Sequence, residues 1–191
     1  MINMNINHET RSENSFVFSH VGIFVKNIAL MRTFYQQALR LYVTDQGVIS
    51  GRDIVFLSQD PQEHHQFALV SGRPDLEQFN VINQISLRVQ GLHVLRSYHR
   101  SLQMAGAGNM DPSTHGNSIS IYCRDPEGNR LEVFMDTQWY CDQPMKASVD
   151  LNQSDEQIYR QVEDIARSAN KFKSRDEWVR DMHNLMAHTK Q

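Results

Sequence analysis

The sequence lacks the features that would tie it to a membrane or to nucleic acid. Its 191 residues contain no apolar run near the roughly 20 residues that a membrane-spanning helix needs. Residues 1–15 are polar and include no apolar segment of the kind found in signal peptides. The formal net charge of −3 excludes the basic excess of a typical nucleic-acid-binding protein. We therefore expect a cytoplasmic protein, with residues 1–15 as a flexible N-terminal arm.

Cysteine is also scarce, because the chain has only Cys123 and Cys141. They form no spacing motif typical of a zinc site or a redox pair, and such sparse use suits a reducing compartment. We expect Cys123 to be a small buried apolar residue on a strand. The apolar share of 40% is ordinary for a globular domain that can bury a core.

What the sequence does contain is an alternation of strand and helix patterns. Phe16–Val25 is rich in β-branched and aromatic residues, which predicts a strand. Asn27 can cap a following helix, whose apolar residues recur at helical spacing. These apolar residues are Met31, Phe34, Tyr35, Ala38 and Leu39. Glycine-containing turns then separate three further predicted strands, at 42–46, 53–58 and 66–71.

The same order occurs a second time. A strand pattern at 82–89 precedes a helical pattern at 92–105 and a Gly- and Pro-containing stretch with room for one short strand. Strands at 118–124 and 130–136 follow, joined by the turn sequence 125–129. Phe18 and Ile82 mark the two starts, 82 − 18 = 64 residues apart. This repeat predicts an α+β domain over 16–137, in which two βαβββ modules (16–72 and 81–137) form a cupped, half-open barrel sheet.

Residues 138–191 are expected to form a linker and a C-terminal helical tail. Ser154 to Gln157 and Ser174 to Glu177 both have the form of a capping box, which predicts the start of an amphipathic helix. We expect both helices to pack outside the sheet or on a partner subunit. A homodimer is expected because it is the commonest oligomer.

Strand alternation predicts which side chains share a face of the sheet. Each of four strands has one aliphatic side, suited to covering helices. The opposite sides bring together His20, Gln84, Tyr122 and Glu132. A sheet with one apolar face and one face of selected polar groups is typical of a cupped binding surface.

Three segments resemble the vicinal-oxygen-chelate superfamily of glyoxalases, bleomycin resistance proteins and extradiol dioxygenases. They are FSHVGIFVKNIALMRTFYQQAL, INQISLRV and THGNSISIYCRDPEGNRLEVF. The similarity extends over about 16–137, and the DPxGxxxE hairpin from Asp125 to Glu132 is its most specific part. Chain length, one pair of modules and a helical tail look most like the one-domain type I extradiol ring-cleavage dioxygenases.

The resemblance implies one divalent metal site. His20 matches the first metal-binding histidine and Glu132 the carboxylate ligand, but Gln84 stands where the family has a second histidine. Two histidines and one carboxylate are the usual ligands of non-haem Fe(II). A glutamine oxygen is a weaker ligand than imidazole. The implied metal is Fe(II) first, with Mn(II), Zn(II) or Ni(II) as alternatives.

The resemblance also implies how a substrate is bound. Tyr122 matches a tyrosine that hydrogen-bonds a catechol, and His115 a histidine that contacts substrate. His65, or less favourably His64, matches an acid/base histidine. The implied activity is ring cleavage of a small aromatic substrate with O2, within an apolar wall. Candidates for that wall are Phe18, Phe24, Phe67 and Phe134.

Two other functions of the same fold stay open. One is a glyoxalase-like lyase or isomerase, which uses Zn(II) or Ni(II) on a substrate with vicinal oxygens. The other is a metal-free ligand-binding protein of the resistance type, because fold alone does not fix function. Each candidate side chain also has a structural alternative. His64 and His65 can end a surface turn, Tyr122 can be a core residue, and Gln84 can satisfy backbone groups.

Overall fold

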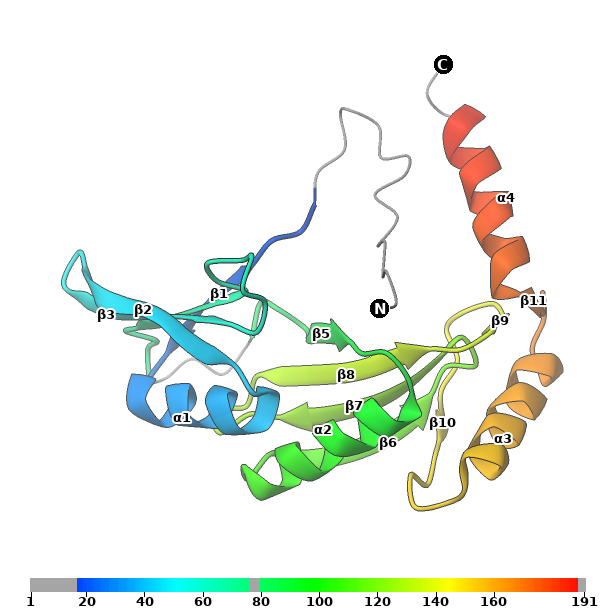
Figure 1. Ribbon diagram of the computed structural model, residues 1–191, viewed down its shortest axis with the longest axis horizontal. Coiled ribbons are helices and arrows are strands. Elements are labelled where there is room, and N and C mark those ends of the chain that lie inside the picture. The colour runs from blue at the N-terminus through cyan, green and yellow to red at the C-terminus, as the bar shows by residue number, and fades with distance from the viewer. Residues whose placement is uncertain (1–16, 76–79, 189–191) are drawn as a thin grey trace, which may run out of the picture.

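The computed structural model describes residues 17–75 and 80–188, and its elements follow the predicted order (Figure 1). The N-terminal arm expected at 1–15 lies outside the described residues. The first module consists of β1 (Val21–Val25), α1 (Ile28–Leu39), β2 (Tyr42–Ile49), β3 (Arg52–Ser58) and β4 (Phe67–Ser71). The second consists of β5 (Ile85–Arg88), α2 (Leu92–Met104), β6 (Gly108–Thr114), β7 (Ser118–Arg124) and β8 (Arg130–Asp136). The tail adds β9 (Trp139–Tyr140), β10 (Ala147–Ser148), α3 (Asp155–Ser168), β11 (Lys173–Ser174) and α4 (Arg175–His188).

Each module builds its own sheet, and the two sheets have matching topology. The first sheet has the strand order β1-β4-β3-β2 and the second the order β10-β6-β7-β8-β5. β1 pairs parallel with β4, and β5 pairs parallel with β8. The registers match as well, since Val21 faces Phe67 and Ile85 faces Leu131, with 85 − 21 = 131 − 67 = 64. The predicted repeat is confirmed, and it makes His20 and Gln84 equivalent positions (84 − 20 = 64).

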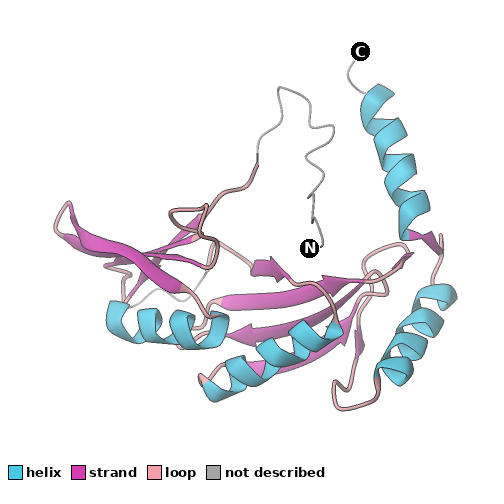
Figure 2. Cartoon of the chain, in the orientation of Figure 1, coloured by secondary structure: helices cyan, strands magenta, loops and turns pink. Residues whose placement is uncertain are grey.

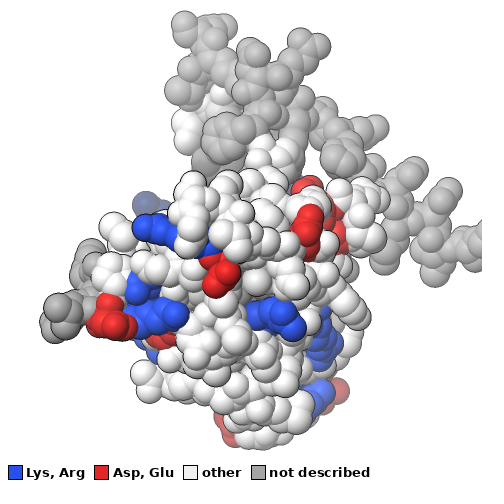
Figure 3. Space-filling model, turned by 90° about the vertical axis from the view of Figure 1, so that its left-hand side faces the viewer, with Lys and Arg blue, Asp and Glu red and all other residues white. Residues whose placement is uncertain are grey.

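The helices α1 and α2 cover one face of the two sheets, as Figure 2 shows. Within the described part of the chain, no helix lies across the opposite face, and no strand pairing joins the two sheets. β1 and β5 are therefore the facing inner edges of a cupped surface. On the side of the molecule shown in Figure 3, lysine and arginine alternate with aspartate and glutamate in small groups.

Local signals explain where α1 forms. The Asn27 side chain accepts a hydrogen bond from the Leu30 amide at 3.0 Å, which confirms the predicted cap. The helix ends at Arg40, whose φ of 58° is left-handed. The five apolar residues that predicted the helix are its buried residues. They pack in one core with the aliphatic sides of both sheets.

The turn between β7 and β8 fastens the second module to the first. The Glu127 carboxylate, only 6% exposed, accepts hydrogen bonds from the backbone amides of Lys26 and Asn27 at 2.8–2.9 Å. It also lies 3.7 Å from the buried guanidinium of Arg73. Asp125 accepts a hydrogen bond from the Tyr35 hydroxyl at 3.1 Å and from backbone amides within its own turn. The conspicuous hairpin motif is thus also an inter-module clamp.

Several elements differ in length from their predictions. β1 and β5 are shorter than the patterns at 16–25 and 82–89. β1 pairs with β4 over only five residues, and β5 pairs with β8 over only four. β6 is longer than the short strand expected, although it contains Pro112, because pairing with β7 and β10 outweighs weak strand propensity. The stretch expected as a linker contains β10, which extends the second sheet.

The two tail helices form where the capping boxes predict them. Ser154 and Gln157 exchange both hydrogen bonds of the box, and Ser174 accepts one from the Glu177 amide. α3 buries an apolar stripe against the domain core, whereas α4 extends away from the body at one end (Figure 1). The Trp178 ring stacks on Tyr140 at 5.4 Å between ring centroids. No described helix is long and apolar enough to cross a membrane.

Candidate functional site

Glu132 lies in the middle of β8 and is held by three neutral donors. Its Oε1 accepts a hydrogen bond from the Ser120 hydroxyl at 2.7 Å. Its Oε2 accepts from the Ser86 hydroxyl at 2.6 Å and from the Gln84 amide at 2.9 Å. The strand register explains this arrangement, because Ser86 is the direct partner of Glu132 across the parallel pair β5–β8. Gln84 and Ser86 share one face by alternation.

The Glu132 carboxylate is buried without a cationic partner. Its residue is 7% exposed, and none of the ion pairs among the described residues includes it. Removing a carboxylate from water is unfavourable unless charge or hydrogen bonds compensate. A carboxylate offers about four lone-pair positions, of which three are used here. Among the described residues the carboxylate is therefore held by neutral donors alone on the cupped face.

A second cluster consists of imidazoles at the facing edge of the first module. The His20 ring, directly before β1, lies 4.3 Å from the His65 ring. The His64 and His65 Nδ1 atoms are 2.9 Å apart, and Phe56 packs at 4.8 Å from His65. Burial, followed by the neighbouring His20 and His64, lowers the pKa of His65 below that of a free imidazole. These contacts give His65 a defined position in a loop between β3 and β4.

Tyr122 and His115 form an oriented pair beside Glu132. His115 Nδ1 lies 2.6 Å from the Met145 carbonyl oxygen, which can only accept, so this nitrogen carries the proton. In the neutral ring His115 Nε2 is then the acceptor, and the Tyr122 hydroxyl donates to it at 2.8 Å. Burial, followed by the Glu132 carboxylate, raises the pKa of Tyr122 to about 12. The phenol is therefore protonated at neutral pH, and its oxygen keeps lone pairs for a ligand hydroxyl.

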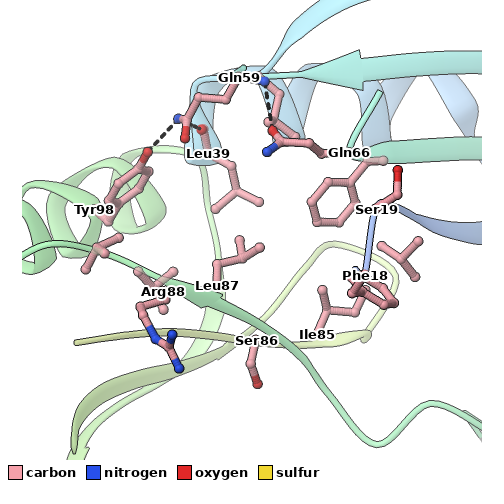
Figure 4. Close-up of a pocket in the computed structure, with 15 residues that line it drawn as sticks. Phe18, Ser19, Leu39, Gln59, Gln66, Ile85, Ser86, Leu87, Arg88 and Tyr98 are labelled. Carbon is pink, nitrogen blue, oxygen red and sulfur yellow. Dashed lines mark hydrogen bonds between the residues drawn. The ribbon is translucent and has the colours of Figure 1, made fainter. Parts of the chain in front are cut away.

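A cavity of about 310 Å³ separates the inner edges β1 and β5. Ile85 and Leu87 point into it, while Ser86 and Arg88 point to the other side of β5 (Figure 4). Its wall includes Phe18 and Phe67, two of the aromatic residues predicted for an apolar wall. Near α2, Gln59 donates a hydrogen bond to the Tyr98 hydroxyl at 2.6 Å (Figure 4).

The structure therefore brings the predicted residues together in pairs. Gln84 contacts Glu132, His65 contacts His20, and His115 contacts Tyr122. No hydrogen bond joins His20 to Glu132 in the structure. Among residues 17–75 and 80–188, no three His, Cys, Asp or Glu side chains are grouped closely enough to hold a metal ion.

The donor chemistry nevertheless fits a divalent cation. One imidazole, one amide oxygen and one carboxylate are ligands that Fe(II) and Mn(II) accept. His20 and Gln84 occupy equivalent positions on the two facing edges, and the buried Glu132 carboxylate has no other countercharge. We conclude that the residues present suit a metal ion in kind, while the assignment of His20, Gln84 and Glu132 as ligands stays a prediction.

Sequence reasoning missed the groups that surround Glu132. Strand alternation places Ser86 on the same face as Gln84, and Ser120 on the same face as Tyr122, so the sequence pattern indicates their common face. Their role as donors to Glu132 depends on the cross-strand register, which a single sequence does not give. Arg130 was missed as well, and its guanidinium carbon lies 4.3 Å from the Tyr122 ring centroid.

Comparisons with known proteins concern the fold and the family of the chain. Residues 17–133 match the family model described as the Glyoxalase/Bleomycin resistance protein/Dioxygenase superfamily. One curated relative is biphenyl-2,3-diol 1,2-dioxygenase 2 of Rhodococcus globerulus, 29% identical over 123 residues. The match covers 62% of each protein, so the chain spans less than two thirds of that relative.

Solved structures show the same fold. A glyoxylase/bleomycin resistance protein/dioxygenase domain from Frankia sp. EAN1pec superposes with a TM-score of 0.56 at 20% identity, covering 65% of this chain and 93% of that one. A fosfomycin resistance protein from Listeria monocytogenes, solved with Mn(II) and sulfate, gives a TM-score of 0.50 at 20% identity, covering 62% and 91%. At this identity the likeness concerns the fold alone.

Proposed function

The chain belongs to the glyoxalase/bleomycin resistance protein/dioxygenase superfamily, and from this premise we propose that it is a metal-dependent extradiol-type dioxygenase acting on a catechol-like ring. The observation that carries the proposal is the buried carboxylate of Glu132, without a cationic partner, next to the oriented Tyr122–His115 pair. The name of the Rhodococcus globerulus relative, a diol dioxygenase, supports the same class of substrate.

His20, Gln84 and Glu132 would hold the metal ion, with Fe(II) preferred and Mn(II), Zn(II) or Ni(II) as alternatives. When bound, the ion would supply a Lewis acid that lowers the pKa of adjacent substrate hydroxyls. Ser86 and Ser120 fix the Glu132 carboxylate by their hydrogen bonds, as supporting groups do around metal ligands. Gln84 would contribute its amide oxygen.

The other predicted residues would orient the substrate and move its protons. The Tyr122 oxygen accepts a hydrogen bond from a substrate hydroxyl, while its own proton points at His115. The Met145 carbonyl holds the His115 ring in place and thereby fixes Tyr122. His65, or alternatively His64, would accept a proton from the second hydroxyl, a step that suits the near-neutral pKa of imidazole.

An assay of ring cleavage tests the proposal directly. The purified protein is loaded with Fe(II) without oxygen and then mixed with aerated catechol, 3-methylcatechol or 2,3-dihydroxybiphenyl. We expect a yellow ring-fission product with matching oxygen uptake, strongly reduced in His65→Ala. The control His93→Ala removes an exposed histidine on α2 and should retain activity. Absence of both colour and oxygen uptake with every diol would contradict the proposal.

A metal-free ligand-binding protein is the second candidate. The observation that favours it is the Gln84 amide, which donates to Glu132 where a metal-binding histidine is expected. Elemental analysis of metal-loaded and dialysed protein separates the two, because only the first proposal expects about one retained ion per chain. The glyoxalase-like lyase, the homodimer and the cytoplasmic location stay predictions. Retained zinc or nickel without oxygen uptake would indicate the lyase.

A further inference from the structure

Arg130 lies beside the candidate site formed by Glu132 and Tyr122. It lies on β8, two residues before Glu132 and on the same face. Its guanidinium stacks on the Tyr122 ring at 4.3 Å between the guanidinium carbon and the ring centroid. Its side chain is half-buried rather than extended into solvent. A ligand that contacts the Tyr122 hydroxyl would therefore lie close to this positive charge.

Three nearby cations have acidic partners, Arg124 across the strand pair donates to the Gly128 carbonyl, and Arg130 has no ion pair among the described residues. Arg88 pairs with Asp136 at 3.2 Å, and Arg73 lies 3.7 Å from Glu127. Lys146, which also lies over the Tyr122 ring, forms an ion pair with Asp111. Within the part of the chain that the structure describes, the Arg130 side chain has neither an ion pair nor a hydrogen bond. Its planar array of five donors is thus available to an anion, and carboxylates match it in a bidentate way.

Arg130 also lines a cavity that suits an aromatic body. This cavity, of about 500 Å³, is also lined by the apolar residues Ile23, Phe24 and Ile82. Its size falls within the range of small-molecule sites. Arg73 lines it too, but its donors are engaged with Glu127, Asn129 and Asn80. Arg130 is therefore the available charged group in a largely apolar wall.

We propose that Arg130 binds a carboxylate carried by the substrate, so that the preferred ligands are dihydroxylated aromatic acids rather than neutral catechols. This inference rests on the proposed function for the two hydroxyls, and adds the charged substituent. Arg130 connects the two regions, because it stacks on the Tyr122 ring and also lines the largely apolar cavity. Losing a charge-assisted bidentate contact should weaken binding by about tenfold or more.

The test compares acids with neutral diols of the same shape. Binding of 2,3- and 3,4-dihydroxybenzoate, and of 3- and 4-methylcatechol, is measured by calorimetry on the metal-loaded protein without oxygen. Wild type should bind at least one acid about tenfold more tightly than its methyl counterpart. Arg130→Gln should abolish that preference and leave binding of the methylcatechols within about threefold, while Arg130→Lys should retain part of it.

Arg88→Gln is the matched control, because it removes an ion-paired arginine from the same cupped face. It should leave the acid preference unchanged. An equal preference in wild type and Arg130→Gln, with both variants folded by circular dichroism, overturns the inference. Cleavage of neutral catechols without any acid preference would preserve the proposed dioxygenase and reject the carboxylate site. Arg130-dependent binding of the acids without ring cleavage would support the carboxylate site and reject the proposed dioxygenase.

Discussion

Replacing Glu127 with alanine should weaken the attachment between the two modules. The substitution removes the acceptor of two backbone amides, Lys26 and Asn27, and the ionic partner of Arg73. A hydrogen bond to a charged group contributes about 1.5–3 kcal/mol, and partly exposed amides favour the low end of that range. Arg73 keeps other acceptors, including the Asn129 side chain. We therefore expect a loss of about 3 kcal/mol in the free energy of unfolding.

Urea denaturation and thermal melting measure this loss. For a chain of this size, about 3 kcal/mol corresponds to a fall of roughly 10 °C in Tm. Glu127→Gln keeps one acceptor oxygen but loses the charge, so it should lose about half as much. Glu156→Ala is the control, because this glutamate is exposed in the first turn of α3 and should cost less than about 1 kcal/mol.

Equal Tm values for Glu127→Ala and the Glu156→Ala control would contradict the role of Glu127 as a clamp between the modules. A large loss of stability in Glu127→Ala, about half that loss in Glu127→Gln and little loss in Glu156→Ala would instead show that the carboxylate joins the modules. The same variant should bind a metal ion more weakly. The clamp sets the spacing of the edges that carry His20 and Gln84, and ligands on separate elements need a fixed separation.

Two further predictions follow from the site and the core. Tyr122→Phe should raise the KM for catechols about tenfold in steady-state kinetics, because it removes one hydrogen bond to substrate and leaves His115 without its donor. The double variant with His115→Asn should have a KM only slightly higher than that of Tyr122→Phe. Additive effects of the two substitutions on KM would refute the coupling between the two side chains. Burial followed by Asp125 raises the pKa of Cys123 to about 12, and burial raises that of Cys141, so neither thiol should react quickly with iodoacetamide at pH 8 in the native protein. Rapid labelling of the native protein would contradict the burial of these thiols. Because both folded-state pKa values exceed that of a free thiol, the two thiols contribute fully to stability below about pH 9, and this contribution is lost as pH rises further.

The fold was predictable where local signals coincide with long-range ones. The bounds of β7 and β8 were predicted residue for residue, because the turn from Asp125 to Asn129 is both a strong turn sequence and a hydrogen-bonded hairpin. The helix cap at Asn27 and the capping box at Ser154 are equally local. By contrast, β10 has only two residues and exists because it pairs with β6, which no local pattern indicates.

The candidate site was predictable in its faces but not in its contacts. Alternation placed Gln84 and Glu132 on one side, and the structure joins them at 2.9 Å. The approach of His20 to His65 depends on the course of the loop before β4, which composition does not determine. The available donors of Arg130 depend on where every nearby acid is already engaged. Such features are properties of the folded molecule rather than of any segment.

Metal affinity tests the central claim that His20, Gln84 and Glu132 bind one divalent ion. Anaerobic titration calorimetry with Fe(II) or Mn(II) should give about one site per chain in wild type, weakened at least about tenfold in His20→Ala and in Glu132→Ala. Gln84→His should bind more tightly than wild type, because imidazole is the better donor. His93→Ala should match wild type. Unchanged affinity in both His20→Ala and Glu132→Ala would contradict the account.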